Sequence, residues 1–262
     1  MPETRFFEQH DGSKIAYQIF KSENAKNEVP LVLIIGLGGT KEHFFGFEEV
    51  IVFDNRGIGE STVVSSADPI TLDLMAQDTI ELIKHLGIKR FNLLGEAMSG
   101  RIALCIALKL QSDLKLEKLI VCSCASHLDT STKVFQEVEQ FYKLPSFNLP
   151  INIQEQKDNL LKSDRDKNLA KYLLEHPDKL DKISEILWEA NKNYDLTPRL
   201  KEIKVPTLII HGEANETVPI QNAELLNRDI PNSQLHRVPN VGHGIFVMVP
   251  ETANVISEFL NN

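Results

Sequence analysis

Short, continuous apolar runs recur along this chain, and helix-like polar segments separate them. Each run is rich in β-branched side chains and ends in glycine or in polar residues. The runs are VPLVLIIG (29–36), EVIVFDNRG (49–57), RFNLLG (90–95), LEKLIVCSC (116–124) and VPTLIIHG (205–212). Continuous rather than alternating apolar character indicates strands that are covered on both faces. This feature predicts a mostly parallel sheet.

Three segments have the apolar spacing or the end signals of helices. The segment 71–87, TLDLMAQDTIELIKHLG, places its apolar residues on one stripe, and Gly87 suits the C-terminal end of a helix. A second helix is predicted over 98–111, and a third over 250–262, where Pro250 stands at a favourable first position. Strands that alternate with helices predict an α/β fold with a doubly wound sheet.

The ends and the middle of the chain complete the expected organisation. Residues 4–20 read as an antiparallel hairpin on the sheet edge. From 127 to 198 no β-rich apolar run occurs, and residues 163–196 predict two helices. This stretch has too few large apolar residues for a core of its own. We therefore expect a single domain over 1–262, with a helical cap insertion over 127–198.

Charge and hydropathy exclude several classes of function. The 28 Lys and Arg against 37 Asp and Glu give a net charge of −9, and no basic run is present, so a nucleic-acid partner is not expected. No apolar stretch reaches the roughly 20 residues that cross a bilayer, and the first residues lack a signal peptide's apolar core. The sequence predicts a cytoplasmic protein without a membrane partner. Its oligomeric state is left open.

The chain has three cysteines, and all of them lie in apolar segments. An odd number of cysteines in apolar surroundings indicates buried, free thiols. Cys122 and Cys124 stand two apart in a predicted strand and would point the same way, which leaves a metal site or a reactive pair as the alternative to core packing. Core packing is the favoured interpretation, and no metal or cofactor is expected.

Polar and glycine-rich segments follow the predicted strands, where open parallel sheets bind their ligands. They are IGLGGT (35–40), DNRGIGES (54–61), GEAMSG (95–100), HGEANETVP (211–219) and PNVGHG (239–244). In this order and spacing they resemble the α/β-hydrolase superfamily, from about Arg5 to Leu260, and in particular its capped esterase, lactonase and carbon–carbon hydrolase branch. The resemblance implies that fold, hydrolysis of an ester or carbon–carbon bond, and a small, partly apolar substrate. IGLGGT lacks the Lys-Ser/Thr of a phosphate-binding loop.

The resemblance assigns a nucleophile position that holds no nucleophile. The family's Gly-x-Ser-x-Gly turn lifts a serine above the sheet, beside a helix N-terminus that receives an oxyanion. Here Gly95 and Gly100 keep the pattern, but Ala97 occupies the serine position and Ser99 that of the following glycine. Alanine has no lone pair with which to attack.

The two partners of the nucleophile are also altered. The resemblance implies that His243 is the general base and that Asn215 stands where the family carries an acid. A carboxylate there holds the histidine's tautomer, whereas an amide donates a hydrogen bond and favours the other tautomer. Asp129 is an alternative acid, because some relatives carry theirs after the preceding strand.

The remaining implied residues shape the pocket. The backbone N–H groups of Leu37 and Met98 would form the oxyanion hole, whatever their side chains. In the 54–61 loop, Asp54 and Arg56 are expected to form a bracing ion pair. The pocket candidates are Gly36, Ser99, Phe44 and Trp188.

Together these features predict an α/β-hydrolase relative with little or no covalent hydrolase activity and a ligand pocket under the cap. Four alternatives stay open. One is an active ester or lactone hydrolase that uses Ser99 or a water molecule, and another is an engineered serine-to-alanine trap. The others are a cofactor-free lyase or isomerase with His243 as its base, and an interaction protein that uses only the scaffold's surface.

Overall fold

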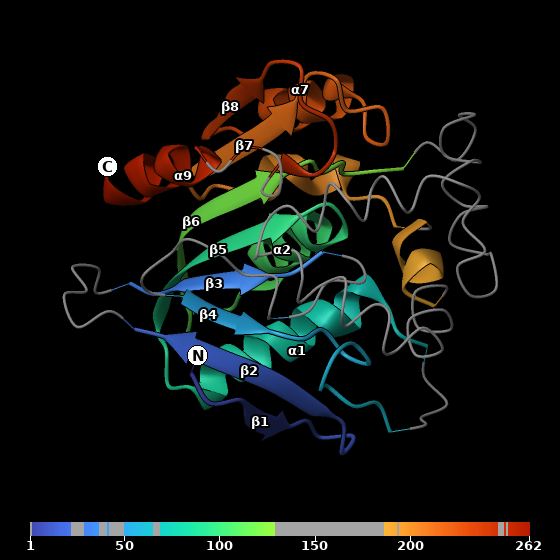
Figure 1. Ribbon diagram of the computed structural model, residues 1–262, viewed down its shortest axis with the longest axis vertical. Helices are drawn as coiled ribbons and strands as arrows, with labels where there is room; N and C mark the ends of the chain where they lie inside the picture. The colour runs from blue at the N-terminus through green and yellow to red at the C-terminus, as the bar shows by residue number, and fades with distance from the viewer. Residues whose placement is uncertain are drawn as a thin grey trace, which may run out of the picture.

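The computed structural model describes residues 2–21, 29–36, 41, 50–64, 69–128, 186–192, 194–245, 249 and 251–262. Within these residues the chain forms one eight-stranded sheet. The strands are β1 (Arg5–Glu8), β2 (Lys14–Phe20), β3 (Leu31–Ile34), β4 (Val50–Phe53), β5 (Arg90–Glu96), β6 (Lys115–Cys122), β7 (Thr207–Gly212) and β8 (Ser233–Val238). They lie side by side in the order β1-β2-β4-β3-β5-β6-β7-β8 (Figure 1).

The sheet is antiparallel only at its N-terminal edge. Strand β1 pairs antiparallel with β2, and β2 pairs antiparallel with β4. Every later pair of neighbours, from β4 with β3 to β7 with β8, is parallel. The carboxyl ends of six strands therefore meet at one edge of the sheet. This topology confirms the predicted mostly parallel α/β sheet with an N-terminal hairpin.

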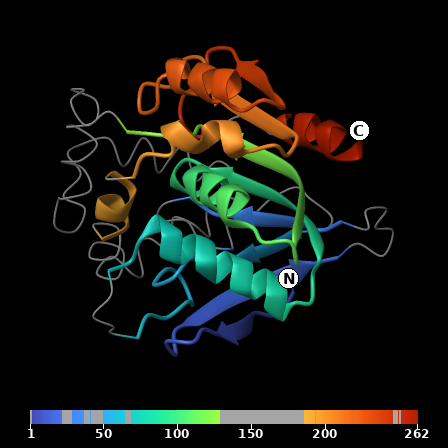
Figure 2. The same cartoon turned by 180° about the vertical axis from the view of Figure 1, so that it is seen from behind.

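Helices cover both faces of the sheet. The described helices with printed bounds are α1 (Leu72–His85), α2 (Met98–Lys109), the 3-10 helix η2 (Thr197–Glu202), α7 (Ile220–Asp229) and α9 (Thr252–Asn261). Figures 1 and 2 show α1, α2, η2 and α7 on one face and α9 on the other, and each face has its own apolar core. Every residue of β3, β4 and β7 is buried between them, which explains the continuous apolar runs. None of the described helices has the length and apolar character needed to cross a bilayer.

Helix α1 shows how local sequence sets an element. Thr71 is its N-cap, and the side-chain oxygen accepts a hydrogen bond from the Leu74 N–H at 3.0 Å. Its apolar stripe faces the core, and Gly87, with φ of +69°, follows its end. The helix predicted over 71–87 is confirmed. The other two predicted helices correspond to α2 and α9, although residue 250 lies outside the described residues.

The sequence pattern does not predict β8 or α7. Strand β8, SQLHRV, is mostly polar because it is the last strand of the described sheet and is less covered than the central strands. Helix α7 buries only Ala223 and Leu226, so its apolar stripe is thin. Both elements form through packing against β7 and its neighbours, which a local pattern does not report.

Most of the expected cap, including residues 129–185, lies outside the described residues. Its returning end is described, and residues 186–192 are helical. The buried Arg101 of α2 donates to the carbonyl oxygens of Asn191 and Tyr194, and to Asn191 Oδ1 at 2.6 Å. The Tyr194 hydroxyl donates to Asp73 Oδ1 of α1 at 2.6 Å. The insertion therefore rejoins the sheet domain through contacts with α1 and α2.

The predicted common direction of Cys122 and Cys124 is wrong. Cys122 packs in the core on the α9 side of the sheet, whereas Cys124 packs with Cys105 on the α1 and α2 side. Strand β6 ends at Cys122, and Ser123 has a φ of +47°, so the alternation of a strand does not continue. All three thiols are free and buried, and no cluster of three metal-ligating side chains occurs among the described residues.

Candidate functional site

The site begins with the sharp turn between β5 and α2. Ala97 occupies that turn with φ of +54° and ψ of −120°, a conformation that side-chain-bearing residues rarely adopt. Its N–H donates to the Cys122 carbonyl at 2.9 Å, and its carbonyl accepts from the Gly100 N–H at 3.1 Å. Strain of this kind costs on the order of 1–3 kcal/mol and persists only where the surroundings impose it.

Two glycines make the turn possible. A Cβ atom on Gly95 would lie 2.2 Å from the Ser99 carbonyl oxygen, and one on Gly100 would lie 2.8 Å from Cys124 Sγ. Neither contact is tolerable without movement of the backbone or of a buried side chain. The spacing of Gly95 and Gly100 around Ala97 is thus a requirement of the close packing between the turn, α2 and the segment after β6.

Ser99 does not present its hydroxyl to the edge of the sheet. Its side chain is fully buried, and Oγ donates a hydrogen bond to the Ile35 carbonyl. Met98, the first residue of α2, places its backbone N–H at the positive end of that helix. Leu37, the other oxyanion-hole candidate, lies outside the described residues.

His243 lies on the loop after β8, near Ala97. Ser123, which follows β6, donates from Oγ to the His243 carbonyl at 2.7 Å. Cys122, the residue before Ser123, accepts the Ala97 N–H with its carbonyl oxygen. Ala97 and His243 are therefore connected through two adjacent residues at the end of β6. The tertiary structure brings these two sequence candidates to the same edge of the sheet.

Asn215 contacts the ring of His243. Its Nδ2 lies 3.2 Å from His243 Nδ1, and its Oδ1 accepts the Val218 N–H at 2.9 Å. The turn after β7 approaches the His243 loop closely, since a Cβ on Gly212 would lie 2.2 Å from the Val241 carbonyl oxygen. Asn215 is buried, and the predicted pairing of positions 215 and 243 occurs through an amide.

A second histidine adjoins the pair. His211 Nε2 lies 2.7 Å from the Val218 carbonyl oxygen and 3.4 Å from Asn215 Nδ2. Burial lowers the pKa of His211 below its ordinary value, although its hydrogen bond to Val218 acts in the opposite direction. Burial, reinforced by the neighbouring His211, lowers the pKa of His243 to about 4. Both rings are accordingly neutral at pH 7.

The other pocket candidates are only partly described. Gly36 follows β3, and a Cβ there would lie 3.4 Å from the Glu96 carbonyl oxygen, so this loop adjoins the turn. Trp188 is buried in the returning end of the cap. Phe44 and the alternative acid Asp129 lie outside the described residues.

The expected ion pair between Asp54 and Arg56 is not present. Arg56 pairs with Asp78, its Nη2 lying 2.5 Å from Oδ1, and also with Asp11. Asp54 instead pairs with the buried Lys41, whose Nζ lies 3.0 Å from Oδ2. The two side chains leave the loop in different directions, toward α1 and toward the segment after β3. Both brace the fold, as the sequence analysis expected, through partners that it did not identify.

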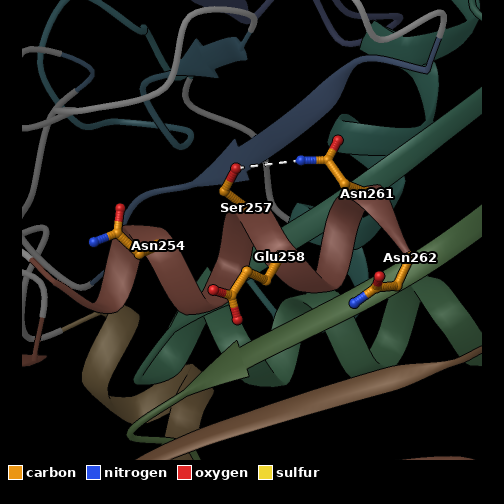
Figure 3. A pocket seen from close by; sticks show the side chains of 5 residues that line it. All are labelled: Asn254, Ser257, Glu258, Asn261 and Asn262. Carbon is orange, nitrogen blue, oxygen red and sulfur yellow. Dashed lines mark hydrogen bonds between the residues drawn. The ribbon is translucent and has the colours of Figure 1, made fainter.

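A polar hollow of about 580 Å³ lies elsewhere, along α9 (Figure 3). Its lining residues are Asn254, Ser257, Glu258, Asn261 and Asn262. None of them belongs to the turn, the histidine pair or the cap, and we assign no function to the hollow.

Sequence reasoning missed Ser123, Val218 and His211, which hold the His243 loop and orient Asn215. Ser123 left a weak signal, because it is a polar residue between two cysteines at a strand end. The two contacts of Val218 are made by backbone atoms, which side-chain identity does not reveal.

Comparison with known proteins supplies the family. Residues 29–248 match the family described as alpha/beta hydrolase fold. The chain belongs to the α/β-hydrolase family. YisY, an AB hydrolase superfamily protein of Bacillus subtilis, is 30% identical to this α/β hydrolase over 229 residues, 80% of each chain.

Two further relatives span nearly the whole α/β-hydrolase chain. A proline iminopeptidase of Clostridioides difficile is 27% identical over 282 residues, 95% of each chain. The solved structure of a thermophilic esterase from Thermogutta terrifontis superposes with a TM-score of 0.75 at 23% identity, covering 99% of this chain and 98% of that one. The structural likeness shows the shared fold.

Proposed function

We propose that this α/β-hydrolase relative binds a small, partly apolar molecule in a pocket beneath the cap and carries out little or no covalent hydrolysis. The observation that carries the proposal is Ala97. It lies at the strained turn after β5, where the family carries its nucleophilic serine, and its methyl group has no lone pair. The turn is retained while the attacking group is not.

Asn215 supports the same conclusion. In a Ser-His-Asp triad the carboxylate holds the imidazole with its proton on Nδ1, and replacement by an amide in a serine protease lowers turnover by about 10⁴-fold. Here an amide nitrogen faces His243 Nδ1. Restoring a serine without the carboxylate would therefore leave the base poorly oriented. We propose the backbone N–H groups of Met98 and Leu37 as the remaining polar contacts for a ligand oxygen.

Ser99 is a poor substitute for the missing nucleophile. Its hydroxyl is fully buried and donates to the Ile35 carbonyl, so attack on a ligand would require the turn to rearrange. A single engineered change from serine to alanine does not account for the departures at Asn215 and Ser99 as well. Both observations favour a binding protein over a working hydrolase.

Membership of the family indicates only a broad class of ligand. The relatives include a proline iminopeptidase and an esterase, which by name act on different bonds. We therefore propose only that the ligand is a small molecule. We propose no metal or cofactor, and no nucleic acid or membrane as partner.

The proposal is tested by hydrolysis of p-nitrophenyl butyrate, together with intact-protein mass spectrometry for an acyl adduct. We expect no turnover and no adduct for the parent, and weak acylation for Ala97→Ser. The double variant with Ala97→Ser and Asn215→Asp should turn over at least tenfold faster than Ala97→Ser alone. Ala97→Gly is the matched control, because it alters the same turn without adding a hydroxyl. An adduct on the parent, or parent turnover that His243→Gln abolishes, would contradict the proposal.

A further inference from the structure

We propose that the neutral ring of His243 carries its proton on Nε2, so that the pocket presents an N–H donor where a hydrolase presents a base. The ligand group held there is then the oxygen of an uncharged carbonyl compound, such as a ketone, lactone, ester or amide. This inference rests on the proposed function, because it describes the ligand of the same site.

The orientation of the Asn215 amide is the first step. Val218 N–H can only donate, so the Asn215 atom that lies 2.9 Å from it must be the oxygen. Flipping the amide would place two donors against each other in a buried position. The atom 3.2 Å from His243 Nδ1 is therefore the NH₂ group, which makes Nδ1 the acceptor.

His211 supports this assignment independently. The Val218 carbonyl oxygen, 2.7 Å from His211 Nε2, can only accept, so this nitrogen carries the ring proton. The 3.4 Å approach of Asn215 Nδ2 to the same nitrogen then brings two donors together and is not a hydrogen bond. Within the described residues, His243 Nδ1 is the acceptor available to the Asn215 amide.

A neutral imidazole that accepts at Nδ1 must donate at Nε2. Nε2 is directed away from Asn215, and it forms no hydrogen bond with any residue that the structure describes. With a methyl group at position 97, no serine hydroxyl is there to accept from it. The same ring is a poor base, because the nitrogen that is directed away from Asn215 already holds a proton. This disfavours the lyase or isomerase alternative.

The charges around the site favour an uncharged ligand. His211 and His243 are neutral, and Ser123 and Asn215 add only dipoles. The cation of the turn's own helix, Arg101, is committed to carbonyl groups of the cap segment. Among the described residues, these N–H donors have no accompanying free positive charge, and such donors match a carbonyl oxygen better than a carboxylate.

The tautomer is measured by long-range ¹H–¹⁵N NMR of the histidine-labelled full chain, with His243→Gln to assign the signals. We expect a protonated Nε2 and a bare Nδ1 in the parent at pH 7, and the reverse in Asn215→Asp. Asn254→Asp adds the same charge on the exposed surface of α9 and should leave the parent pattern unchanged. A protonated Nδ1 in the parent overturns the inference.

The ligand class is tested with three probes of similar shape, acetophenone, ethylbenzene and benzoate. Acetophenone has a carbonyl oxygen, and ethylbenzene has a CH₂ in its place. We expect millimolar acetophenone to shift the His243 Nε2 signal of the parent, and ethylbenzene or benzoate to shift it at least fivefold less. No shift with acetophenone, or an equal shift with either other probe, overturns the ligand class. Failure of the proposed function is read separately, as an acyl adduct in the mass spectrum.

Discussion

Ala97 combines a strained backbone with a side chain that gains nothing from the strain. The positive φ serves to expose a side-chain oxygen in a hydrolase, whereas here it exposes a methyl group. The turn persists because Gly95 and Gly100 allow close packing and because Cys122 accepts the Ala97 N–H. The strain energy is thus stored in the folded state without a nucleophile to use it.

Replacing Ala97 with glycine should therefore increase stability. Glycine adopts positive φ without strain, and this gain exceeds the extra flexibility that it gives the unfolded chain. We expect the free energy of unfolding to rise by up to about 1 kcal/mol in urea titrations. Ala107→Gly, the same change inside α2, should lower it by about 1 kcal/mol. Equal destabilisation by both variants would show that the turn is not strained.

At the scale of elements, α2 joins the turn to the returning end of the cap. Its N-terminus begins beside Ala97, and one turn later the buried Arg101 donates to the carbonyl oxygens of Asn191 and Tyr194. Burial lowers the pKa of Arg101, and three oxygen acceptors offset the cost of holding its charge in the core. Helix α2 thereby supports both the site and the cap.

Removing this guanidinium should loosen the cap's attachment. Arg101→Met roughly keeps the length of the side chain but leaves the carbonyl groups of Asn191 and Tyr194 without this donor. We expect the free energy of unfolding to fall by about 2–4 kcal/mol in denaturant titrations. Arg228→Met, which removes an exposed ion pair with Asp229, should change it by less than about 1 kcal/mol. A similar small loss for Arg101→Met would contradict the role given to it.

At the scale of the whole molecule, parallel strands assemble the site from distant parts of the chain. Strands β5, β6 and β7 are neighbours, so the residues after them, Ala97, Ser123 and Asn215, reach the same edge, and the loop after β8 adds His243. The histidines at this edge are neutral, and His211 is buried while His243 is half-buried. Their protonation is therefore coupled to the folding of the whole domain.

Acid should destabilise the parent through these histidines. The pKa of His243 is about 4 when folded and about 6.5 when unfolded, so the unfolded chain binds the proton first as pH falls. Its contribution is fully present above pH 6.5 and is lost progressively toward pH 4, amounting to about 2–3 kcal/mol. His211 acts in the same direction. Urea titrations at several pH values across this range give the free energy of unfolding as a function of pH. We expect it to fall less steeply with decreasing pH in His243→Gln than in the parent, and identical pH dependence would contradict the lowered pKa.

Local chemistry alone determined much of this protein. Continuous apolar runs specified the five strands that the sequence predicted, because a strand that is buried on both faces needs apolar residues along nearly its whole length. The spacing of Gly95, Ala97 and Gly100 indicated the sharp turn, and the order of the motifs indicated the family. Both features can be read from short segments of the sequence and from their order along the chain. His243 and Asn215 were identified as a pair in the same way, through the resemblance of their segments.

Only the tertiary structure decided which residues contact each other. Arg56 pairs with Asp78 and Asp11 rather than with Asp54, and Ser123 breaks the alternation that would have aligned Cys122 with Cys124. The polar edge strand β8 formed by pairing with β7. The direction of the Asn215 amide depended on a backbone N–H, and the ring proton of His243 depended in turn on that amide. Hydrogen bonds are directional and join groups far apart in the chain, so no local pattern of residues encodes which donor meets which acceptor.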